Sequence, residues 1–273
     1  MEGQRHLGIF SWFGFVLPFQ KRLSLIKEAG FDATSIWWED EDKPWLTKKE
    51  DMPKLVENMG LVLDNLHVPY NNSNELWSEH TSVRSEFIQR HIRWLNDCAI
   101  HHIPVMVMHL TEGLNPPDPN HYGLQSFCQL VEAAEELGVT IAIENTRRSD
   151  NLPYLLSGIP SNSLGYCYDS SHYFLSNKQD YDLLDNFSER LVATHLSDND
   201  GLEDRHWLPG HGIIDWVGLS RHFPTAYHGG LTLEAYPTVE ERQQSPEAYL
   251  EAALQKAKDV CILLGNSTVS AIR

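Results

Sequence analysis

The chain has 273 residues, of which 41% are hydrophobic, and this length suits one large domain with a single core. It carries 38 Asp and Glu residues against 21 Lys and Arg residues, which gives a formal net charge of -17 at pH 7. This balance opposes binding to a phosphate backbone. Because no dense Lys/Arg cluster occurs either, we expect no nucleic-acid partner.

Two further features of the sequence bear on where the protein works. The cysteines are far apart, lie in otherwise apolar contexts and form no C-x-x-C pair, so we expect buried free thiols in a reducing compartment: Cys98, Cys128, Cys167 and Cys261. The apolar N-terminal patch lacks the flanks of a signal peptide, and no apolar run approaches the ~20 residues of a membrane span. We therefore expect a cytoplasmic protein without a membrane partner, and homo-oligomerisation stays open.

Short apolar runs typical of buried strands alternate with amphipathic segments typical of helices along the whole chain. The first five predicted strand and helix pairs are 6–12 with 19–30, 33–39 with 52–60, 61–68 with 79–101, 104–110 with 123–138, and 139–145 with 152–158. The last three are 164–170 with 180–190, 191–197 with 215–223, and 231–236 with 246–264. The strands are nearly continuous apolar runs, as expected of a parallel sheet covered on both faces.

Eight strand–helix units without a Gly-rich phosphate loop predict a closed (β/α)8 barrel rather than an open, doubly wound sheet. No linker, repeat or low-complexity segment divides the sequence. We therefore predict a single-domain α/β TIM barrel over residues 1–265, followed by a C-terminal tail at 266–273.

Six of the predicted strands end in a side chain that can bind a metal ion or transfer a proton. In chain order these are His67, His109, Glu144, Asp169, His195 and Glu234. Because all strands of a barrel end at the same rim, groups that are distant in sequence converge there on one pocket. A single histidine at a strand end is more often a hydrogen-bonded structural residue, so it is the convergence that favours a site.

The two glutamates are the stronger signal. Glu144 and Glu234 each lie in an apolar strand, where a buried carboxylate is costly without a cation or strong hydrogen bonds. With Asp169 and His195 from the strands between them, they form an oxygen-rich set of ligands with one imidazole. Such a set suits Mn²⁺, Mg²⁺, Co²⁺ or Zn²⁺, and the sequence does not select among these ions.

Three more polar residues are candidates for the same pocket. His172 lies three residues after Asp169 and either contacts a substrate or packs against its aromatic neighbours, and the convergence favours the first. Asp204 and His206 alternate about Arg205, so both face one side of an extended loop, with a solvated surface loop as the alternative. Aromatic residues near the rim either line the pocket or pack beneath helices: Trp12, Phe13, Trp37, Trp38 and Trp207.

These segments resemble the xylose isomerase-like barrels, a superfamily of sugar isomerases and epimerases that also contains endonuclease IV-type AP endonucleases. The resemblance spans roughly residues 6–264, and its motifs occur in the expected order at the expected strand ends: LHVPY, AIEN, GYCYDSSHYF, THLSDNDGLEDRHWLPGHGIIDW and LTLEAY. In the isomerase and epimerase branch, the resemblance implies one divalent metal ion held by Glu144, Asp169, His195 and Glu234. It also implies that the two glutamates act as the acid/base pair and that His172 contacts the substrate.

In the endonuclease branch, the resemblance implies a three-zinc cluster that also uses five further residues, all of matching type here: His67, His109, His172, Asp204 and His206. Three departures weigh against that branch. The loop PGHGIIDW is similar to sugar isomerase-like members, MHLTEG replaces the His-Pro-Gly turn expected after the fourth strand, and the net charge is -17. The Arg that some ketose 3-epimerases place shortly after the seventh-strand histidine is also missing, which weakens a match to that group.

We therefore expect a metal-dependent isomerase or epimerase that acts on a small polyhydroxylated carbonyl compound through an enediolate. The sequence shows no obvious phosphate-binding motif, which favours a free or oxidised sugar over a sugar phosphate. Two enzymatic alternatives stay open: an AP endonuclease, and a dehydratase or lyase that uses the same enolate chemistry to expel a β-hydroxyl. A non-catalytic sugar-binding barrel is disfavoured because the full ligand set is retained.

Overall fold

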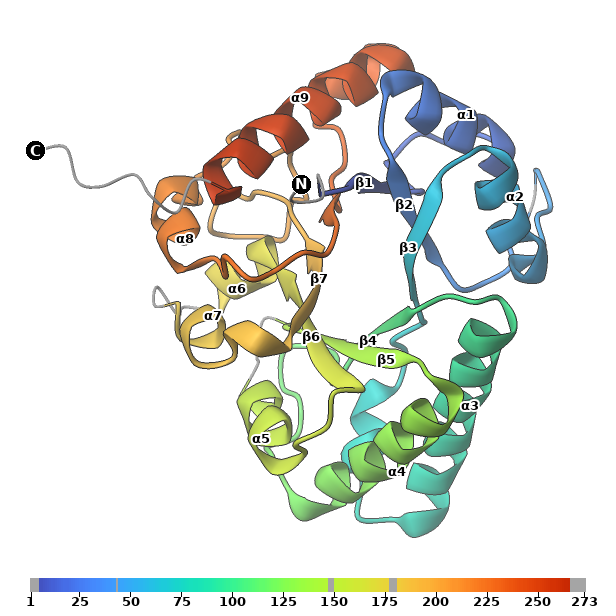
Figure 1. Ribbon diagram of the computed structural model, residues 1–273, viewed down its shortest axis with the longest axis vertical. Coiled ribbons are helices and arrows are strands. Elements are labelled where there is room, and N and C mark those ends of the chain that lie inside the picture. Colours follow the sequence, from blue (N-terminus) through green and yellow to red (C-terminus); the bar gives the residue numbers. More distant parts are fainter. Residues whose placement is uncertain (1–4, 43, 147–149, 177–180, 266–273) are drawn as a thin grey trace, which may run out of the picture.

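The computed structural model describes residues 5–42, 44–146, 150–176 and 181–265, which form a barrel of parallel strands surrounded by helices (Figure 1). The strands are β1 (Leu7–Phe10), β2 (Ala33–Trp37), β3 (Val62–His67), β4 (Val105–His109), β5 (Thr140–Glu144), β6 (Leu164–Asp169), β7 (Leu191–His195) and β8 (Leu231–Leu233). The α-helices are α1 (Phe19–Ala29), α2 (Met52–Asn58), α3 (Thr81–Ile100), α4 (His121–Leu137), α5 (Asn151–Gly158), α6 (Ser170–Leu175), α7 (Asp182–Asn186), α8 (Trp216–His222) and α9 (Pro246–Gly265). Short 3₁₀ helices are η1 (Lys49–Asp51), η2 (Ser73–Trp77), η3 (Ser188–Arg190) and η4 (Glu241–Gln243). The predicted tail at 266–273 lies outside the described residues.

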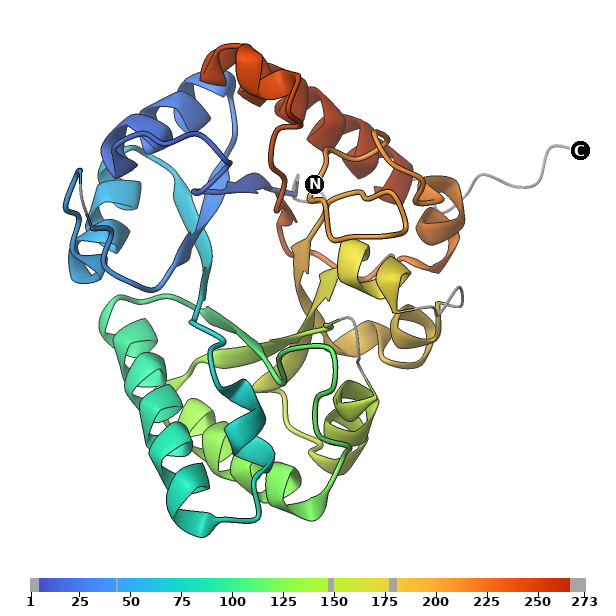
Figure 2. The ribbon, with the colours of Figure 1, turned by 180° about the vertical axis from the view of Figure 1, so that it is seen from behind.

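The eight strands pair in parallel in the order β7-β6-β5-β4-β3-β2-β1-β8. The two ends of this sheet meet, because Leu196 and Leu233 form a parallel bridge. There the Leu196 N–H donates to the carbonyl of Thr232 at 2.9 Å, and the Glu234 N–H donates to the carbonyl of Leu196 at 3.2 Å. The predicted (β/α)8 barrel is thereby confirmed, and the view from behind shows the same helices outside the ring of strands (Figure 2).

Three differences between the predicted and the observed elements concern the strands and helices near the site. The helix predicted at 180–190 is shorter, since it consists of α7 followed by η3. The six-residue helix α6 was not predicted, because a segment of that length shows too little of the 3.6-residue period; it begins where the Asp169 carboxylate accepts the His172 N–H at 2.6 Å. Strand β8 ends at Leu233, so Glu234 lies one residue beyond the strand rather than within it.

Small side chains fill the barrel directly beneath the rim. They form a buried cluster of their own, which consists of Val107, Ala142, Cys167 and Ala193. Each precedes by two residues the polar residue that ends its strand: His109, Glu144, Asp169 and His195. Because alternate side chains of a strand share one face, these four polar side chains also point toward the barrel axis, above a layer of small residues.

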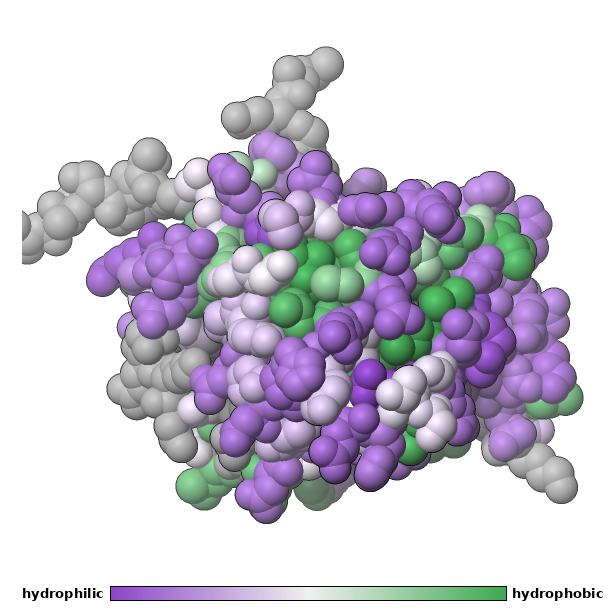
Figure 3. Space-filling view, turned by 90° about the horizontal axis from the view of Figure 1, so that it is seen from below, coloured by the Kyte–Doolittle hydropathy of each residue, from purple (hydrophilic) through white to green (hydrophobic). Residues whose placement is uncertain are grey.

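All four cysteines are free. Cys98 and Cys167 are buried as predicted, but Cys128 and Cys261 are only half-buried, because they lie on α4 and α9 where the core-facing side of each helix meets its exposed side. No helix in the described parts of the chain combines the length and apolarity that crossing a bilayer requires. On the face drawn in Figure 3, hydrophilic side chains surround a smaller group of hydrophobic ones.

Candidate functional site

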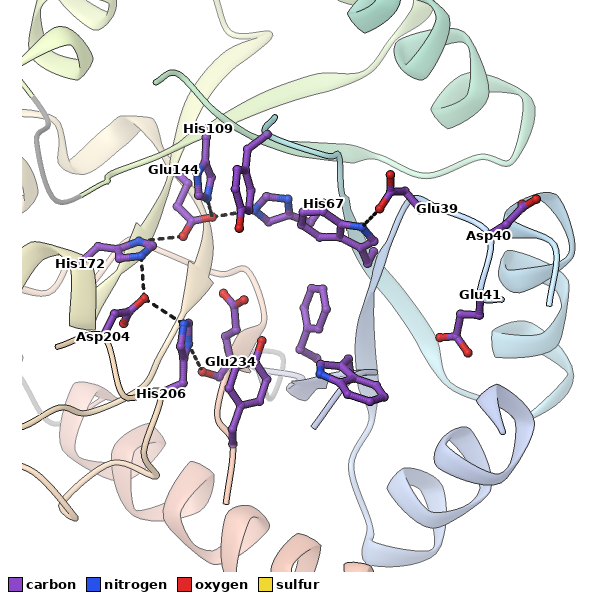
Figure 4. A pocket seen from close by; sticks show the side chains of 15 residues that line it. Glu39, Asp40, Glu41, His67, His109, Glu144, His172, Asp204, His206 and Glu234 are labelled. Carbon is purple, nitrogen blue, oxygen red and sulfur yellow. Dashed lines mark hydrogen bonds and ion pairs between the residues drawn. The ribbon is translucent and has the colours of Figure 1, made fainter. Parts of the chain in front are cut away.

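The polar residues at the strand ends surround one side of a cavity of about 510 Å³ (Figure 4). Seven of the nine predicted site residues line this cavity: His67, His109, Glu144, His172, Asp204, His206 and Glu234. The other two, Asp169 and His195, are fully buried next to them. The barrel therefore brings all nine predicted residues to one place.

Four of these residues form a compact group of potential metal ligands. Glu144, Asp169, His195 and Glu234 each offer one ligand atom, and the four atoms all lie within 4.8 Å of one another. His195 Nδ1 is 3.2 Å from Glu144 Oε2 and 2.8 Å from Glu234 Oε2. Asp169 Oδ2 is buried and accepts no hydrogen bond from the residues that the structure describes. Because a buried carboxylate oxygen beside two more carboxylates requires a cation or a proton, the residues present fit a divalent metal ion.

Glu144 is surrounded by imidazole rings. Its Oε2 lies 2.9 Å from His67 Nε2 and 3.4 Å from His109 Nε2, and its Oε1 lies 3.1 Å from His172 Nδ1. His67 Nδ1 donates to the carbonyl of Val68 at 2.8 Å, so in the neutral ring Nε2 turns a lone pair toward the Glu144 carboxylate. A proton or a cation must lie between these two groups. His67, Glu144 and His195 accordingly form a second group whose ligand atoms lie within 4.8 Å of one another.

The buried charges change one another's protonation. Burial raises the pKa of Asp169 to about 7, and the negative charge of Glu144 adds to this effect. Burial also opposes ionisation of Glu144, but the positive charges of His195 and His109 hold its pKa well below the usual range. Burial would lower the pKa of His195, yet neighbouring negative charges, Glu234 among them, raise it well above its usual value. Without a metal ion the cluster therefore holds protons, and metal binding would release them.

A second cluster centres on Asp204. Its Oδ2 lies 2.9 Å from Nε2 of both His172 and His206, and its Oδ1 accepts the Ser171 hydroxyl at 2.5 Å. The other ring nitrogen of His206 donates to the backbone carbonyl of Glu234 at 3.0 Å. Although burial would lower the pKa of His206, its hydrogen bond to Asp204 raises that pKa to about 9. Both predicted loop residues thus line the pocket, where the Asp204 side chain remains partly exposed to solvent.

The aromatic residues near the rim divide into two groups. Trp12 and Trp37 line the cavity. Phe13 and Trp38 are buried in the core, and Trp207 is not among the residues that line the cavity. Only two of the five aromatic candidates therefore face the pocket.

Several lining residues were missed in the sequence. Tyr70 stacks on His109 with ring centroids 4.5 Å apart, and the Tyr236 ring lies 4.7 Å from that of His206. Their positions shortly after His67 and Glu234 were a usable signal, as was Phe10 at the end of β1. The side of the pocket opposite His172 and Asp204 carries three acidic residues that no motif marked (Figure 4): Glu39, Asp40 and Glu41.

Two proteins of unassigned function share part of this sequence. The uncharacterized protein y4fM of Sinorhizobium fredii (strain NBRC 101917 / NGR234) is 33% identical over 103 residues, which cover 36% of this chain and 33% of that protein. The uncharacterized protein MJ1311 of Methanocaldococcus jannaschii is 26% identical over 117 residues, which cover 39% of this chain and 40% of that protein. The chain thus matches only about a third to two fifths of the length of these relatives.

Solved structures with low sequence identity share the whole fold. An L-ribulose 3-epimerase superimposes with a TM-score of 0.75 at 13% identity, covering 99% of this chain and 100% of that one. The D-psicose 3-epimerase of Clostridium cellulolyticum H10, solved with D-tagatose, gives 0.75 at 14% identity and covers 95% and 99%. A xylose isomerase-like TIM barrel/4-hydroxyphenylpyruvate dioxygenase fusion protein gives 0.79 at 16% identity and covers 99% of this chain and 46% of that one. At these identities the likeness concerns the fold.

The match to a family model covers more of the chain than the matches to single relatives do. The family described as xylose isomerase-like TIM barrel matches residues 23–259, which include all nine candidate site residues. This agrees with the closed eight-stranded barrel and with the position of the site at the strand ends. The chain belongs to the xylose isomerase-like TIM barrel family.

Proposed function

We propose that this chain is a metal-dependent isomerase or epimerase of a small polyhydroxylated carbonyl compound. The observation that carries the proposal is the group of four ligand atoms within 4.8 Å of one another beside a cavity of about 510 Å³. Barrels of the same fold include an L-ribulose 3-epimerase and a D-psicose 3-epimerase, which supports a sugar as the substrate.

In this proposal Glu144, Asp169, His195 and Glu234 hold one divalent ion, which is Mn²⁺, Mg²⁺, Co²⁺ or Zn²⁺. When bound, the ion polarises the substrate carbonyl and stabilises the negative charge that develops when the neighbouring carbon loses its proton. Asp169 has its free carboxylate oxygen available for this purpose, while its other oxygen holds the start of α6.

Glu144 and Glu234 are the proton-transfer pair in the proposal. They come from β5 and from the residue just beyond β8, so they reach the pocket from different parts of the barrel. One carboxylate removes the proton and the other returns one to a different carbon or to the opposite face. His172 lies between Glu144 and Asp204 and lines the cavity, where it contacts the substrate in this proposal.

Two indole rings provide the complementary surface. Trp12 and Trp37 line the same cavity as the carboxylates and histidines. An aromatic face packs well against the C–H face of a sugar, while the polar cluster binds its hydroxyl groups. The cavity thus combines an apolar surface with convergent polar groups, as a polyol substrate requires.

The proposal is tested by deuterium incorporation. The protein is reconstituted with Mg²⁺ or Mn²⁺ and incubated in D₂O with a panel of free and oxidised sugars that includes D-psicose, D-tagatose and D-fructose, and the sugars are then separated and their masses measured. We expect conversion of at least one sugar of the panel with deuterium in the product, and loss of this activity in Glu144→Gln and Glu234→Gln but not in the exposed control Glu136→Gln. Failure to bind any divalent ion under these conditions would overturn the proposal.

Conversion with full retention of substrate hydrogen would instead indicate a hydride shift and remove both glutamates from their proton-transfer roles. A dehydrated, lighter product would identify the dehydratase or lyase alternative.

A second candidate is an AP endonuclease, favoured by one specific observation. The ligand atoms of His67, Glu144 and His195 form a second close group, and Asp204 with His206 adds further metal-competent side chains beside it. A nuclease of this type needs about three zinc ions. Zinc analysis together with incision of a duplex that contains one abasic site separates the two functions, because efficient incision that is lost in His206→Ala would establish the nuclease.

A further inference from the structure

We propose that Asp198 is a positioning residue whose buried carboxylate holds the loop that carries Asp204 and His206 in place. Only the description of these two residues as part of an active site rests on the proposed function. The positioning itself is a statement about the loop after β7, and it is tested without a metal ion or a substrate.

The Asp198 side chain is fully buried and accepts four hydrogen bonds from nitrogen. Its Oδ1 accepts the backbone N–H of Asn199 at 2.9 Å and of Ile214 at 3.1 Å. Its Oδ2 accepts the backbone N–H of Gly210 at 2.8 Å and the indole N–H of Trp216 at 2.9 Å. These four donors are spread over the loop and the start of α8, so one carboxylate ties the two ends of the loop together. Hydrogen bonds to an ionised acceptor are shorter and about twice as strong as neutral ones.

The backbone of Asp198 also fixes the residue that follows His206. Asp198 and Trp207 exchange two backbone hydrogen bonds, at 2.7 and 2.9 Å. His206 itself has a φ of 50°, in the left-handed region that few side chains other than glycine adopt. Its carbonyl accepts the Tyr236 N–H at 2.6 Å, and its ring donates to the carbonyl of Glu234. His206 is therefore held by the chain beyond β8 on one side and by the loop that Asp198 organises on the other.

Asp204 is linked to the neighbour of Asp198 in the chain, Asn199, through the side chain of Ser171. The Asn199 side-chain amide donates to the carbonyl and hydroxyl of Ser171, at 3.2 and 2.9 Å, and the Ser171 hydroxyl donates to Asp204. The loop also passes very close to the Asp198 carboxylate at Gly212, where an added Cβ would collide with Asp198 Oδ1 and with the carbonyl of Asn199. The loop is thus packed around this carboxylate rather than merely attached to it.

The Asp198→Asn variant should release the loop without removing a residue from the pocket. Asparagine keeps the shape but replaces one acceptor oxygen with an amide that faces two N–H donors. Those donors then remain buried without a partner, which is strongly unfavourable. We expect the population of open loop conformations to rise roughly ten-fold or more.

The test measures, by NMR, the rate at which the ring N–H proton of His206 exchanges with water in metal-free protein labelled with ¹⁵N-histidine. This proton is hydrogen-bonded to the Glu234 carbonyl, so we expect its exchange with water to be slow, and its resonance is assigned by its absence in His206→Gln. His91 provides an internal control, because its ring N–H donates to the carbonyl of Phe87 at 2.7 Å within the buried face of α3. In Asp198→Asn we expect the His206 proton to exchange at least ten-fold faster, while the His91 proton is unchanged. A folded Asp198→Asn protein with wild-type exchange at His206 would overturn the proposal.

Two further variants keep the test decisive. Asp215→Asn is the matched control, since Asp215 lies in the same segment and caps α8 through the Gly218 N–H, which asparagine caps equally well, and it should leave both resonances unchanged. Loss of the His91 signal in Asp198→Asn would mean that this variant has unfolded. Trp216→Phe then replaces it in the test, because the Trp216→Phe substitution removes a single N–H donor to Asp198 and keeps an aromatic ring. We expect several-fold faster exchange at His206 in Trp216→Phe, and wild-type exchange there would equally overturn the proposal. None of these results depends on whether the wild-type protein binds a metal ion.

Discussion

Replacing Asp169 with asparagine should change metal binding and metal-free stability in opposite directions. One oxygen of Asp169 accepts the His172 N–H at the start of α6, and the amide oxygen of asparagine can still do so. The other oxygen is buried close to the ligand atoms of Glu144, His195 and Glu234, and no residue in the described part of the chain donates a hydrogen bond to it. The substitution therefore keeps the helix cap and removes only the charge at the candidate metal site.

The pKa of Asp169 gives the size and the sign of the stability change. Burial raises this pKa to about 7 in the folded, metal-free protein from a reference value of 3.8. Between these values the folded protein retains a proton that the unfolded chain releases, so stability falls as the pH rises through this window. The full penalty applies above pH 7, and about three pKa units at 1.36 kcal/mol each set an upper bound of about 4 kcal/mol. Asparagine cannot ionise, so the metal-free variant should exceed the wild type in stability by up to about 4 kcal/mol at pH 8 and match it near pH 4.

Two measurements check this prediction. Urea unfolding in the presence of a chelator at pH 8 and pH 4 gives the stability difference, and elemental analysis after reconstitution with Mn²⁺ gives the metal content. Asp215→Asn serves as the control, because Asp215 also caps a helix but is not part of the cluster. A metal-free Asp169→Asn protein less stable than the wild type at pH 8 would refute the reasoning about burial, and undiminished metal content would remove Asp169 from the metal site.

Three other predictions concern single residues. With a substrate identified, Glu144→Gln and Glu234→Gln should each lower turnover by ~10²–10⁴-fold with a smaller effect on substrate binding, and metal content measured in the same samples shows whether lost metal contributes. Burial lowers the pKa of His91 to about 4, so between pH 6.5 and 4 the unfolded chain binds a proton that the folded protein does not. The free energy of unfolding should therefore fall by about 3 kcal/mol as the pH is lowered from 6.5 to 4. In urea unfolding, His91→Gln should lack this part of the pH dependence, and a pH profile identical to that of the wild type would contradict the prediction. Gly123→Ala should lower the thermal midpoint, because the added Cβ would collide with the Trp77 ring; an unchanged midpoint would show that the ring can move at little cost.

The strand ends could be predicted because two independent patterns coincide there. Parallel strands covered on both faces appear as continuous apolar runs, and six of these runs end in a single polar residue. Barrel geometry then requires that residues as distant as His67 and Glu234 meet, and the structure brings them to one cavity. This part of the site follows from the pattern of apolar runs in the sequence and from the topology of the barrel.

The roles of the acidic residues in the loop after β7 could not be predicted. Asp198 and Asp204 are the same residue type in the same turn-rich segment, yet the first accepts four hydrogen bonds from the loop and the start of α8, and the second contacts His172 and His206. Asp215 caps α8. Which donor each carboxylate meets depends on the path of the loop in three dimensions, and that path has no periodic signature. The same reason explains why Glu39 was missed, since it lines the pocket from an irregular segment after β2.

The most direct test of the proposed function is an anomalous difference map from crystals of the protein grown with Mn²⁺. We predict one strong peak, bonded to side-chain atoms of Glu144, Asp169, His195 and Glu234 at ~2.0–2.2 Å. Three peaks that also contact His67, His109, Asp204 and His206 would favour the nuclease. A map without a peak at these four residues would contradict the proposed function.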